Sequence, residues 1–131
     1  MSNIEFSYLY RDGSNYKKWA AVVFSNPHQL DTNFINQELR HAFLPDGWFI
    51  ASQVRVQEVF LYSEGQVSFD DHCYHEFHGV RPTADRTTDA YGRSISEFVA
   101  EVKQQSQFGW RAFDPYHRRG SFGSFLMPRL P

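Results

Sequence analysis

The sequence predicts an α+β fold, in which an antiparallel-rich sheet of about five to seven strands carries two helices packed on one face. Two observations lead to this prediction. Runs of strand-forming residues mostly follow one another along the chain, and only two segments have apolar residues at helical spacing. Because two helices cover one face of such a sheet, the other face remains for solvent, a ligand or a second copy of the chain. We therefore expect a homo-oligomer.

The length of 131 residues fits one domain, which we place at residues 1–115, followed by a basic and apolar C-terminal tail at residues 116–131. Aromatic residues make up 18% of the chain, so rings are expected both in the core and on a recognition surface. The formal charge of -2 argues against bulk nucleic-acid binding. With one cysteine, no signal-like segment and no apolar run of ~20 residues, a cytoplasmic protein without membrane association is expected.

Residues 4–25 predict a β-hairpin. Apolar and aromatic residues alternate with others over residues 4–10, and residues 19–24 form a second run of strand-forming residues. The hinge at residues 11–15 contains Asp12-Gly13, a pair suited to a tight turn because Gly tolerates positive φ and Asp bonds to the backbone ahead of it.

A helix is predicted after the hairpin, with Asp31 or Thr32 as its N-cap and Pro45-Asp46-Gly47 after its end. A second helix begins at Ser94, because Ser94-Ile95-Ser96-Glu97 fits the capping box and an apolar stripe follows. Between and after the helices, further strands are predicted at residues 48–51, 54–62, 67–69, 70–80 and 110–113.

Histidines and carboxylates are concentrated in residues 70–78. On a strand, alternate residues share a face, so Asp70, His72, Glu76 and His78 would lie together as ligands for zinc or a redox metal. A metal-dependent hydrolase is therefore an alternative function. The spacing matches no standard zinc pattern, and a hydrogen-bonded strand face or an acid–base role stays open for the same residues.

A second set of residues combines cations with aromatic rings. A nucleotide needs a ring to stack on its base and cationic or backbone donors for its phosphates. Arg93 directly precedes the Ser94 cap, where free backbone donors of a helix attract anions. The predicted ligand-binding residues are Arg11, Tyr16, Lys17, Trp19, Tyr91, Arg93, Arg118 and Arg119. The competing interpretation is that each of them is an ordinary surface residue.

The tail contains Phe122, Phe125, Leu126 and Met127, which are apolar enough to require burial. We expect it to dock on its own domain or on a neighbouring subunit, with disorder as the alternative. A protein-binding inhibitor or adaptor that uses the tail and the open sheet face is a further alternative function.

No catalytic motif occurs in the chain. The nucleophile elbow, the phosphate-binding loop and the Rossmann glycine pattern are all missing, and Cys73 lacks a thiolate-stabilising neighbourhood. We therefore predict no catalytic residue, no cofactor, and a binding protein in preference to an enzyme.

Three segments, residues 10–17, 23–27 and 75–77, resemble a group of small uncharacterised bacterial and phage proteins, with a Tyr-Arg-Asp-Gly-x-Asn-Tyr-Lys hairpin. This group is similar to the phage anti-Thoeris sponges, oligomers that sequester cyclic ADP-ribose-type immune signals. The resemblance implies a counter-defence protein and assigns no role to a particular residue. Together with the cations and rings, it leads us to expect a non-enzymatic protein that sequesters a small phosphorylated signalling nucleotide.

Overall fold

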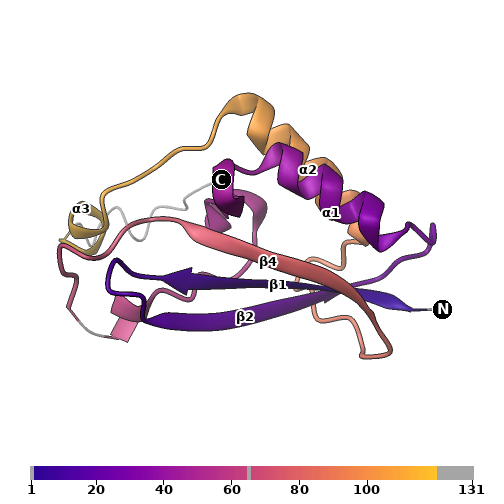
Figure 1. Ribbon diagram of the computed structural model, residues 1–131, viewed down its shortest axis with the longest axis horizontal. Helices are drawn as coiled ribbons and strands as arrows, with labels where there is room; N and C mark the ends of the chain where they lie inside the picture. Colours follow the sequence, from indigo (N-terminus) through magenta and orange to yellow (C-terminus); the bar gives the residue numbers. More distant parts are fainter. Residues whose placement is uncertain (1, 65, 121–131) are drawn as a thin grey trace.

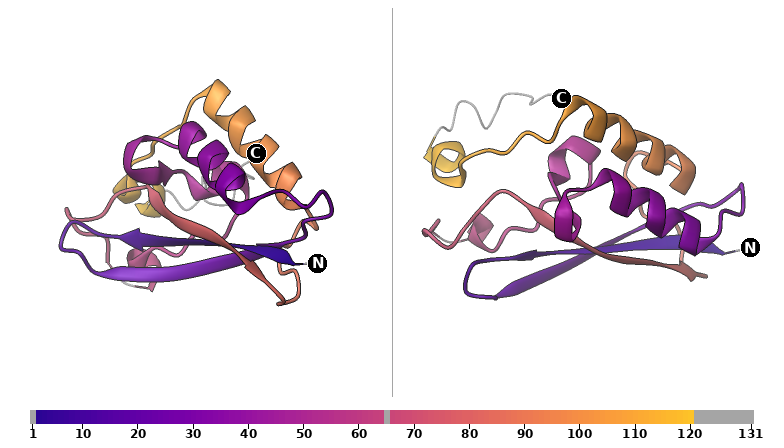
Figure 2. Two further views of the ribbon diagram at one scale, coloured as in Figure 1. Left: turned by 45° about the vertical axis from the view of Figure 1, so that its right-hand side comes forward. Right: turned by 45° about the horizontal axis from the view of Figure 1, so that its top comes forward.

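The computed structural model describes residues 2–64 and 66–120. It confirms an α+β fold built on a four-stranded antiparallel sheet with the strand order β2-β1-β4-β3. The sheet curls like half of a barrel, and the two main helices, α1 and α2, lie on one of its faces (Figures 1 and 2). The expected count of five to seven strands is wrong, because most of the short segments predicted as strands form no ladder.

The predicted hairpin is confirmed. Strand β1 (Asn3–Arg11) pairs antiparallel with β2 (Lys17–Phe24), with Ile4 opposite Phe24 and Arg11 opposite Lys17. Asp12 shapes the turn, since its carboxylate accepts the backbone N–H groups of Ser14 and Tyr16, both at 2.9 Å. Asn15 has a positive φ of 72°, as expected for a residue that tolerates this conformation.

Strand β4 (His75–Thr83) pairs with β1, and the short β3 (Trp48–Phe49) pairs with β4. The strand predicted over residues 70–80 therefore begins five residues late. Residues 51–54 form a 3-10 turn instead of continuing β3, and residues 67–69 and 110–113 form no strand.

The predicted strand at residues 54–62 is also absent, and side chains explain why. The N–H of Val59 donates to the His75 imidazole at 2.9 Å, and the C=O of Gln57 accepts the Tyr8 hydroxyl at 2.7 Å. These backbone groups are satisfied without a neighbouring strand, so this segment crosses the core as irregular chain. It ends in a further 3-10 turn at residues 61–64.

Both predicted helices are confirmed. Helix α1 (Thr32–Ala42) is capped by Asp31, whose carboxylate accepts the N–H groups of Asn33 and Phe34. Helix α2 (Ile95–Phe108) carries the predicted capping box between Ser94 and Glu97. Both helices turn their apolar sides toward the sheet.

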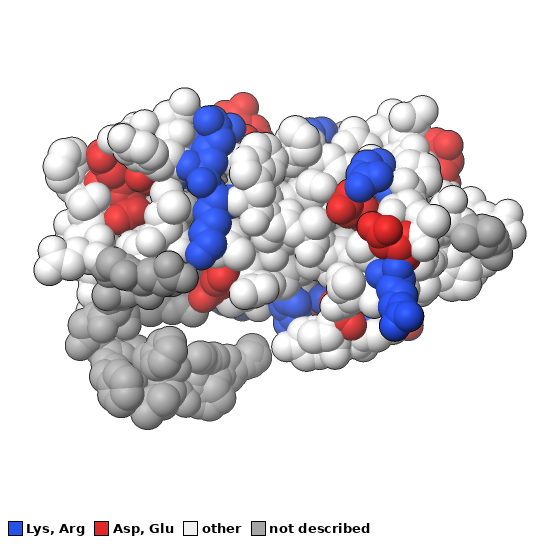
Figure 3. Space-filling view, turned by 90° about the horizontal axis from the view of Figure 1, so that it is seen from below, with Lys and Arg blue, Asp and Glu red and all other residues white. Residues whose placement is uncertain are grey.

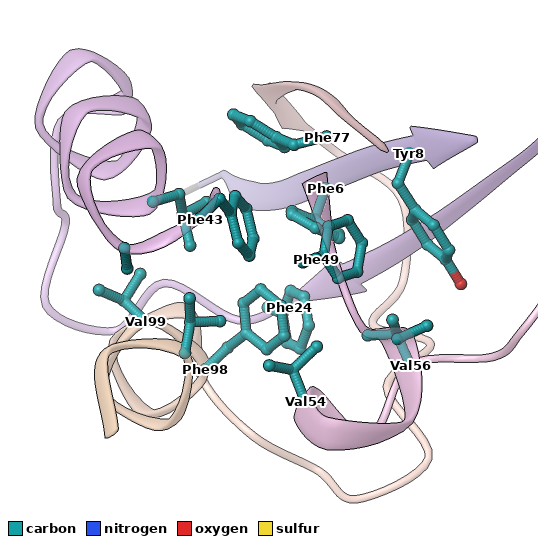
Figure 4. Close-up of a cluster of buried hydrophobic side chains, with 14 of the residues drawn as sticks. Phe6, Tyr8, Phe24, Phe43, Phe49, Val54, Val56, Phe77, Phe98 and Val99 are labelled. Atoms are coloured by element: carbon teal, nitrogen blue, oxygen red, sulfur yellow. The ribbon is translucent and has the colours of Figure 1, made fainter. Parts of the chain in front are cut away.

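The core between helices and sheet is made largely of aromatic rings (Figure 4). Phe6 lies at its centre and is fully buried. Its ring lies within 6.3 Å, between centroids, of the rings of Tyr8, Phe43, Phe49, Phe77 and Phe98. Such ring clusters bury large areas and fix the relative positions of the elements that contribute them. The prediction of an aromatic core is therefore confirmed.

Helix α3 (Pro115–Gly120) lies toward the end of the molecule where the β1–β2 turn lies (Figure 2). The predicted tail thus begins as a helix, and its apolar residues Phe122, Phe125, Leu126 and Met127 lie outside the described residues. Within residues 2–64 and 66–120, no helix is both long and apolar enough to cross a bilayer.

Candidate binding surface

The outer face of the sheet, opposite the helices, carries a row of four residues from four strands. The strand register places Trp19 beside Leu9, Leu9 beside Glu76, and Glu76 beside Trp48. With strands ~4.8 Å apart, the two tryptophans stand about 14 Å from each other at the backbone. Leu9 is only 1% exposed although its side chain points outward, so the side chains around it cover it. We call this row and its ring neighbours the outer aromatic surface.

Trp19 marks the β2 side of the outer aromatic surface and is 54% exposed. Its indole meets the exposed imidazole of His78 edge to face, with ring centroids 5.0 Å apart. His78 reaches this position because the register of β1 with β4 shifts between Ser7 and Tyr8, which leaves one extra residue on β4. The contact holds the exposed indole in a defined orientation.

Trp48 marks the opposite side and is 37% exposed. Its indole stacks on the imidazole of His72 at 5.2 Å between centroids and 8° between planes, and Tyr74 packs against both rings. Burial raises the pKa of the Tyr74 phenol, which therefore stays neutral. This group offers a flat, rigid ring face to solvent.

His72 is fixed by both of its ring nitrogens. Nδ1 accepts the backbone N–H of Tyr74 at 3.0 Å, so Nε2 carries the proton and donates to the C=O of Arg11 at 2.7 Å. The ring thereby joins the loop before β4 to the end of β1, and neither nitrogen is available to a metal.

Arg11 lies between the two aromatic groups and forms a forked ion pair with Glu76. Its Nε and second terminal nitrogen donate to the two Glu76 oxygens at 3.0 and 3.1 Å, and the remaining nitrogen donates to Asn15 at 2.6 Å. The hydrogen bond to Glu76 raises the pKa of Arg11. Both side chains stay partly exposed, at 38% and 25%, so an anion can approach this pair from solvent.

The end of the hairpin adds Tyr16 and Lys17, which are both exposed, Tyr16 at 70%. The turn itself is held against the loop before β4. Asp70 accepts the N–H of Gly13 through its backbone C=O at 2.9 Å, and its carboxylate accepts the Ser14 hydroxyl at 2.6 Å. Four predicted site residues, Arg11, Tyr16, Lys17 and Trp19, are therefore gathered at one end of one rigid hairpin.

The alternative metal site at Asp70, His72, Glu76 and His78 is not formed. Asp70 binds the hairpin turn, His72 binds two backbone groups, Glu76 pairs with Arg11, and His78 packs on Trp19. The cause is the late start of β4, because alternation cannot place Asp70 and His72 on a strand face when both precede the strand. Among residues 2–64 and 66–120, no three His, Cys, Asp or Glu side chains are grouped closely enough to hold a metal ion.

Arg93 and Tyr91 lie elsewhere. The Arg93 guanidinium is 6% exposed and forms ion pairs with Asp89 at 2.8 Å and Glu101 at 3.0 Å. It also donates to the backbone C=O groups of Val54 and Arg55. The expectation that it presents its charge to a ligand is wrong.

An anion does occupy this place at the start of α2, and it comes from the chain itself. The Asp89 carboxylate accepts both the backbone N–H and the guanidinium of Arg93. Burial raises the pKa of Asp89, but its bonds to Arg93 outweigh burial and hold that pKa below its usual range. Tyr91 is exposed beside this network, with the Arg55 guanidinium 4.3 Å from its ring centre.

The two groups of predicted residues stand at opposite ends of the hairpin. Arg93 lies 5.6 Å from the ring of Phe24, the last residue of β2, whereas Lys17 is the first. The two ends are seven residue steps apart along the strand, or about 23 Å. Arg118 and Arg119 belong to α3, of which the structure describes the backbone course at these positions. Within the described part of one protomer, the predicted residues therefore do not form a single pocket.

Sequence reasoning missed Trp48 and Tyr74 as members of the surface, and His78 as the neighbour of Trp19. Their roles depend on the pairing of β3 with β4 and on the shifted register of β4. Local sequence patterns predict neither of these. The available signal was the alternation of Trp48 with Phe49, which predicts that one of these two rings faces outward.

Seen from below, the outer face of the sheet shows an uncharged area between two groups of charged side chains (Figure 3). Small residues contribute to it, since Ala21, Ser7 and Gly79 stand side by side in the row next to the tryptophans. A Cβ added to Gly79 would meet nothing within 4 Å. The face is therefore open beside the rings.

Comparison with protein-family models, with curated proteins and with solved structures yields no match.

Proposed function

We propose that this chain is a non-enzymatic binding protein that sequesters a small phosphorylated nucleotide on the outer aromatic surface. One observation carries the proposal: two exposed indoles, Trp19 and Trp48, are each held in place by an imidazole on the open face of the sheet. Fixed, exposed rings are the usual means by which proteins hold nucleobases without reading their sequence.

The charges beside the rings suit a ligand with few phosphates. The ammonium of Lys17 is exposed at the end of the hairpin, and the Arg11 guanidinium can donate to a phosphate that displaces Glu76. Displacing Glu76 costs part of the gain, so affinity depends mainly on stacking, about 1–3 kcal/mol per base. The overall charge of -2 further favours a small ligand over a polynucleotide.

The resemblance to the anti-Thoeris sponges supports a cyclic ADP-ribose-type or other cyclic nucleotide as the ligand. It also supports a role in phage counter-defence, in the cytoplasm, as a homo-oligomer. Arg93 has no place in this proposed site because its charge is used inside the fold.

The test is to release small molecules from the purified protein by heating and to identify them by mass spectrometry. In parallel, cyclic ADP-ribose, ADP-ribose and cyclic dinucleotides are titrated while tryptophan fluorescence is recorded. We expect quenching by one of these probes, and Trp19→Ala should weaken its affinity roughly 5- to 150-fold, which corresponds to the loss of about 1–3 kcal/mol of stacking.

The matched control is Phe108→Ala, which removes a ring that is 70% exposed on α2, away from the sheet. Its affinity should equal that of the parent protein. If heating releases no nucleotide and no probe binds, nucleotide sequestration is wrong.

A protein-binding inhibitor or adaptor is the second candidate, and Phe69 favours it. Its ring is 90% exposed between Ser68 and Asp70, and hydrogen bonds hold both neighbours in place. A large ring presented this openly on an anchored loop is typical of a contact residue in a protein interface. Loss of partner binding in Phe69→Ala, in a protein that binds no nucleotide, would favour this function.

A further inference from the structure

We propose that a second copy of this chain pairs antiparallel with the open edge of β2, with Trp19 of both copies at the two-fold axis. The order β2-β1-β4-β3 leaves β2 at an edge of the sheet. Backbone N–H and C=O groups along such a strand point alternately toward the neighbouring strand and toward the open side.

The hydrogen bonds of Val23 show which backbone groups of β2 point toward the open edge. Its N–H donates to the Thr88 hydroxyl at 2.9 Å, and its C=O accepts the N–H groups of Thr88 and Asp89. By alternation, the backbone groups of Ala21, Trp19 and Lys17 point to the same side. In residues 2–64 and 66–120 no hydrogen-bond partner meets those of Trp19 or Ala21. The loop at residues 88–89 thus covers one end of the edge and leaves the rest open.

The open part has few of the features by which proteins usually protect an edge strand. It contains no proline, its pairing with β1 runs without a bulge, and its only charges are Lys17 and Lys18 at its start. The four residues that follow, Trp19 to Val22, are all uncharged. An edge whose uncharged part is open in this way is a template for another strand.

A second copy fits this edge in one register. When Trp19 faces Trp19 of the second copy, Lys17 faces Ala21 and Lys18 faces Ala20, so no two like charges are opposed. In each copy, three residues have backbone groups that point toward the open edge. In this register they form up to six hydrogen bonds between the chains, in the pattern of an antiparallel ladder.

Other registers are worse. Centring the pairing on Lys18 places two ammonium groups directly opposite each other. Shifting the centre to Ala20 or Ala21 places Lys17 or Trp19 opposite Val23, whose backbone groups Thr88 and Asp89 already occupy, so fewer hydrogen bonds form between the copies.

The pairing also extends the outer aromatic surface across two copies. The side chain of Trp19 lies on the outer face and contacts His78 on β4, so the two copies present their indoles on the same face, on either side of the axis. A ligand would then find rings from two chains, a consequence that rests on the proposed function. The pairing itself rests on backbone groups and stands without a ligand.

The experiment measures the molar mass of ligand-free protein by light scattering or sedimentation. The parent protein should be a dimer. Trp19→Glu and Trp19→Lys should each be monomeric, because they place like charges on the axis, and an equimolar mixture of the two should form a dimer again. A monomeric parent protein, or a Trp19→Glu protein that stays dimeric, overturns the proposal.

Amide hydrogen exchange gives a second readout. The N–H groups of Trp19 and Ala21 should be protected in the parent protein and should exchange fast in Trp19→Glu, while that of Val23 stays protected in both. Protection of Trp19 and Ala21 in a monomer would show that another segment of the same chain covers the edge, and the pairing of copies would be wrong.

Discussion

Arg93 and His75 lie in the interior of the molecule, whereas Arg11 and His72 lie on the outer face of the sheet. The guanidinium of Arg93 is 6% exposed and that of Arg11 is 38% exposed. Each arginine pairs with carboxylates, but only the interior one also donates to backbone carbonyls from a distant segment. The imidazoles differ in the same way, since His75 is 1% exposed and His72 is partly exposed.

The comparison teaches that residue type alone does not decide what a polar group does. In the interior every bond of Arg93 is part of the fold, and removing it leaves a buried charge. On the outer face, solvent or a ligand can replace the partner of Arg11 at little cost. The predictions below test this contrast, starting with the largest effect.

Replacing Arg93 with Met should destabilise the protein by about 3–5 kcal/mol. The variant leaves the Asp89 carboxylate, 3% exposed, without its cation, and it removes the donors from the C=O groups of Val54 and Arg55. Urea denaturation followed by circular dichroism measures the change. A loss of stability of this size would contradict the idea that Arg93 is free to bind a ligand.

Arg11→Met is the matched control, because it removes the same group from the outer face. Its pair with Glu76 is partly exposed, and such pairs contribute roughly 0–1 kcal/mol. If Arg11→Met and Arg93→Met destabilised the protein equally, the contrast between interior and outer face would not hold.

The buried His75 should make the protein sensitive to acid. Burial lowers the pKa of its imidazole to about 3, whereas an unfolded His has a pKa near ~6.5. Between these values the unfolded chain binds a proton that the folded chain does not, so stability falls as the pH falls from about 6.5 toward 3. The expected slope is about 1.4 kcal/mol per pH unit.

The measurement is the free energy of unfolding at a series of pH values, compared with that of His75→Leu. At neutral pH this variant should be less stable, because the N–H of Val59 loses its acceptor. Its stability should nevertheless depend less on pH over the same range. An unchanged slope in His75→Leu would assign the acid sensitivity to other groups.

The sequence predicted the hairpin and both helices because local chemistry determines them. Asp12 shapes the turn, in which Asn15 and not Gly13 has the positive φ, Asp31 caps α1, and Ser94 with Glu97 caps α2. The number of strands could not be predicted in this way. Residues 54–62 have the composition of a strand, but His75 and Tyr8, distant in sequence, satisfy backbone groups that a ladder would otherwise have used.

The candidate site was predictable at the hairpin and nowhere else. Four cationic and aromatic residues close in sequence remain close on a rigid turn, so Arg11, Tyr16, Lys17 and Trp19 are brought together. The position of Arg93 before a helix predicted an anionic ligand at this place, but the carboxylate that binds Arg93 belongs to the chain itself. Pattern alone could not reveal that the anion is Asp89, four residues earlier in the same chain.

The smallest expected effects compare two glycines, one at a closed contact and one on the open outer face. A Cβ at Gly13 would lie 3.2 Å from a carboxylate oxygen of Asp70, so Gly13→Ala should loosen the contact between the turn and this loop and destabilise the protein by several tenths of a kcal/mol.

A Cβ at Gly79, in the middle of β4, would meet nothing within 4 Å. Gly79→Ala should therefore stabilise the protein by roughly 0.5–1 kcal/mol, because alanine loses less conformational entropy than glycine when a strand forms. Thermal melts of the two variants, run beside the parent protein, measure both effects. If Gly13→Ala lowers the melting temperature and Gly79→Ala raises it, the face beside the tryptophans is open. If Gly79→Ala also lowers the melting temperature, another part of the protein or a second copy covers this face.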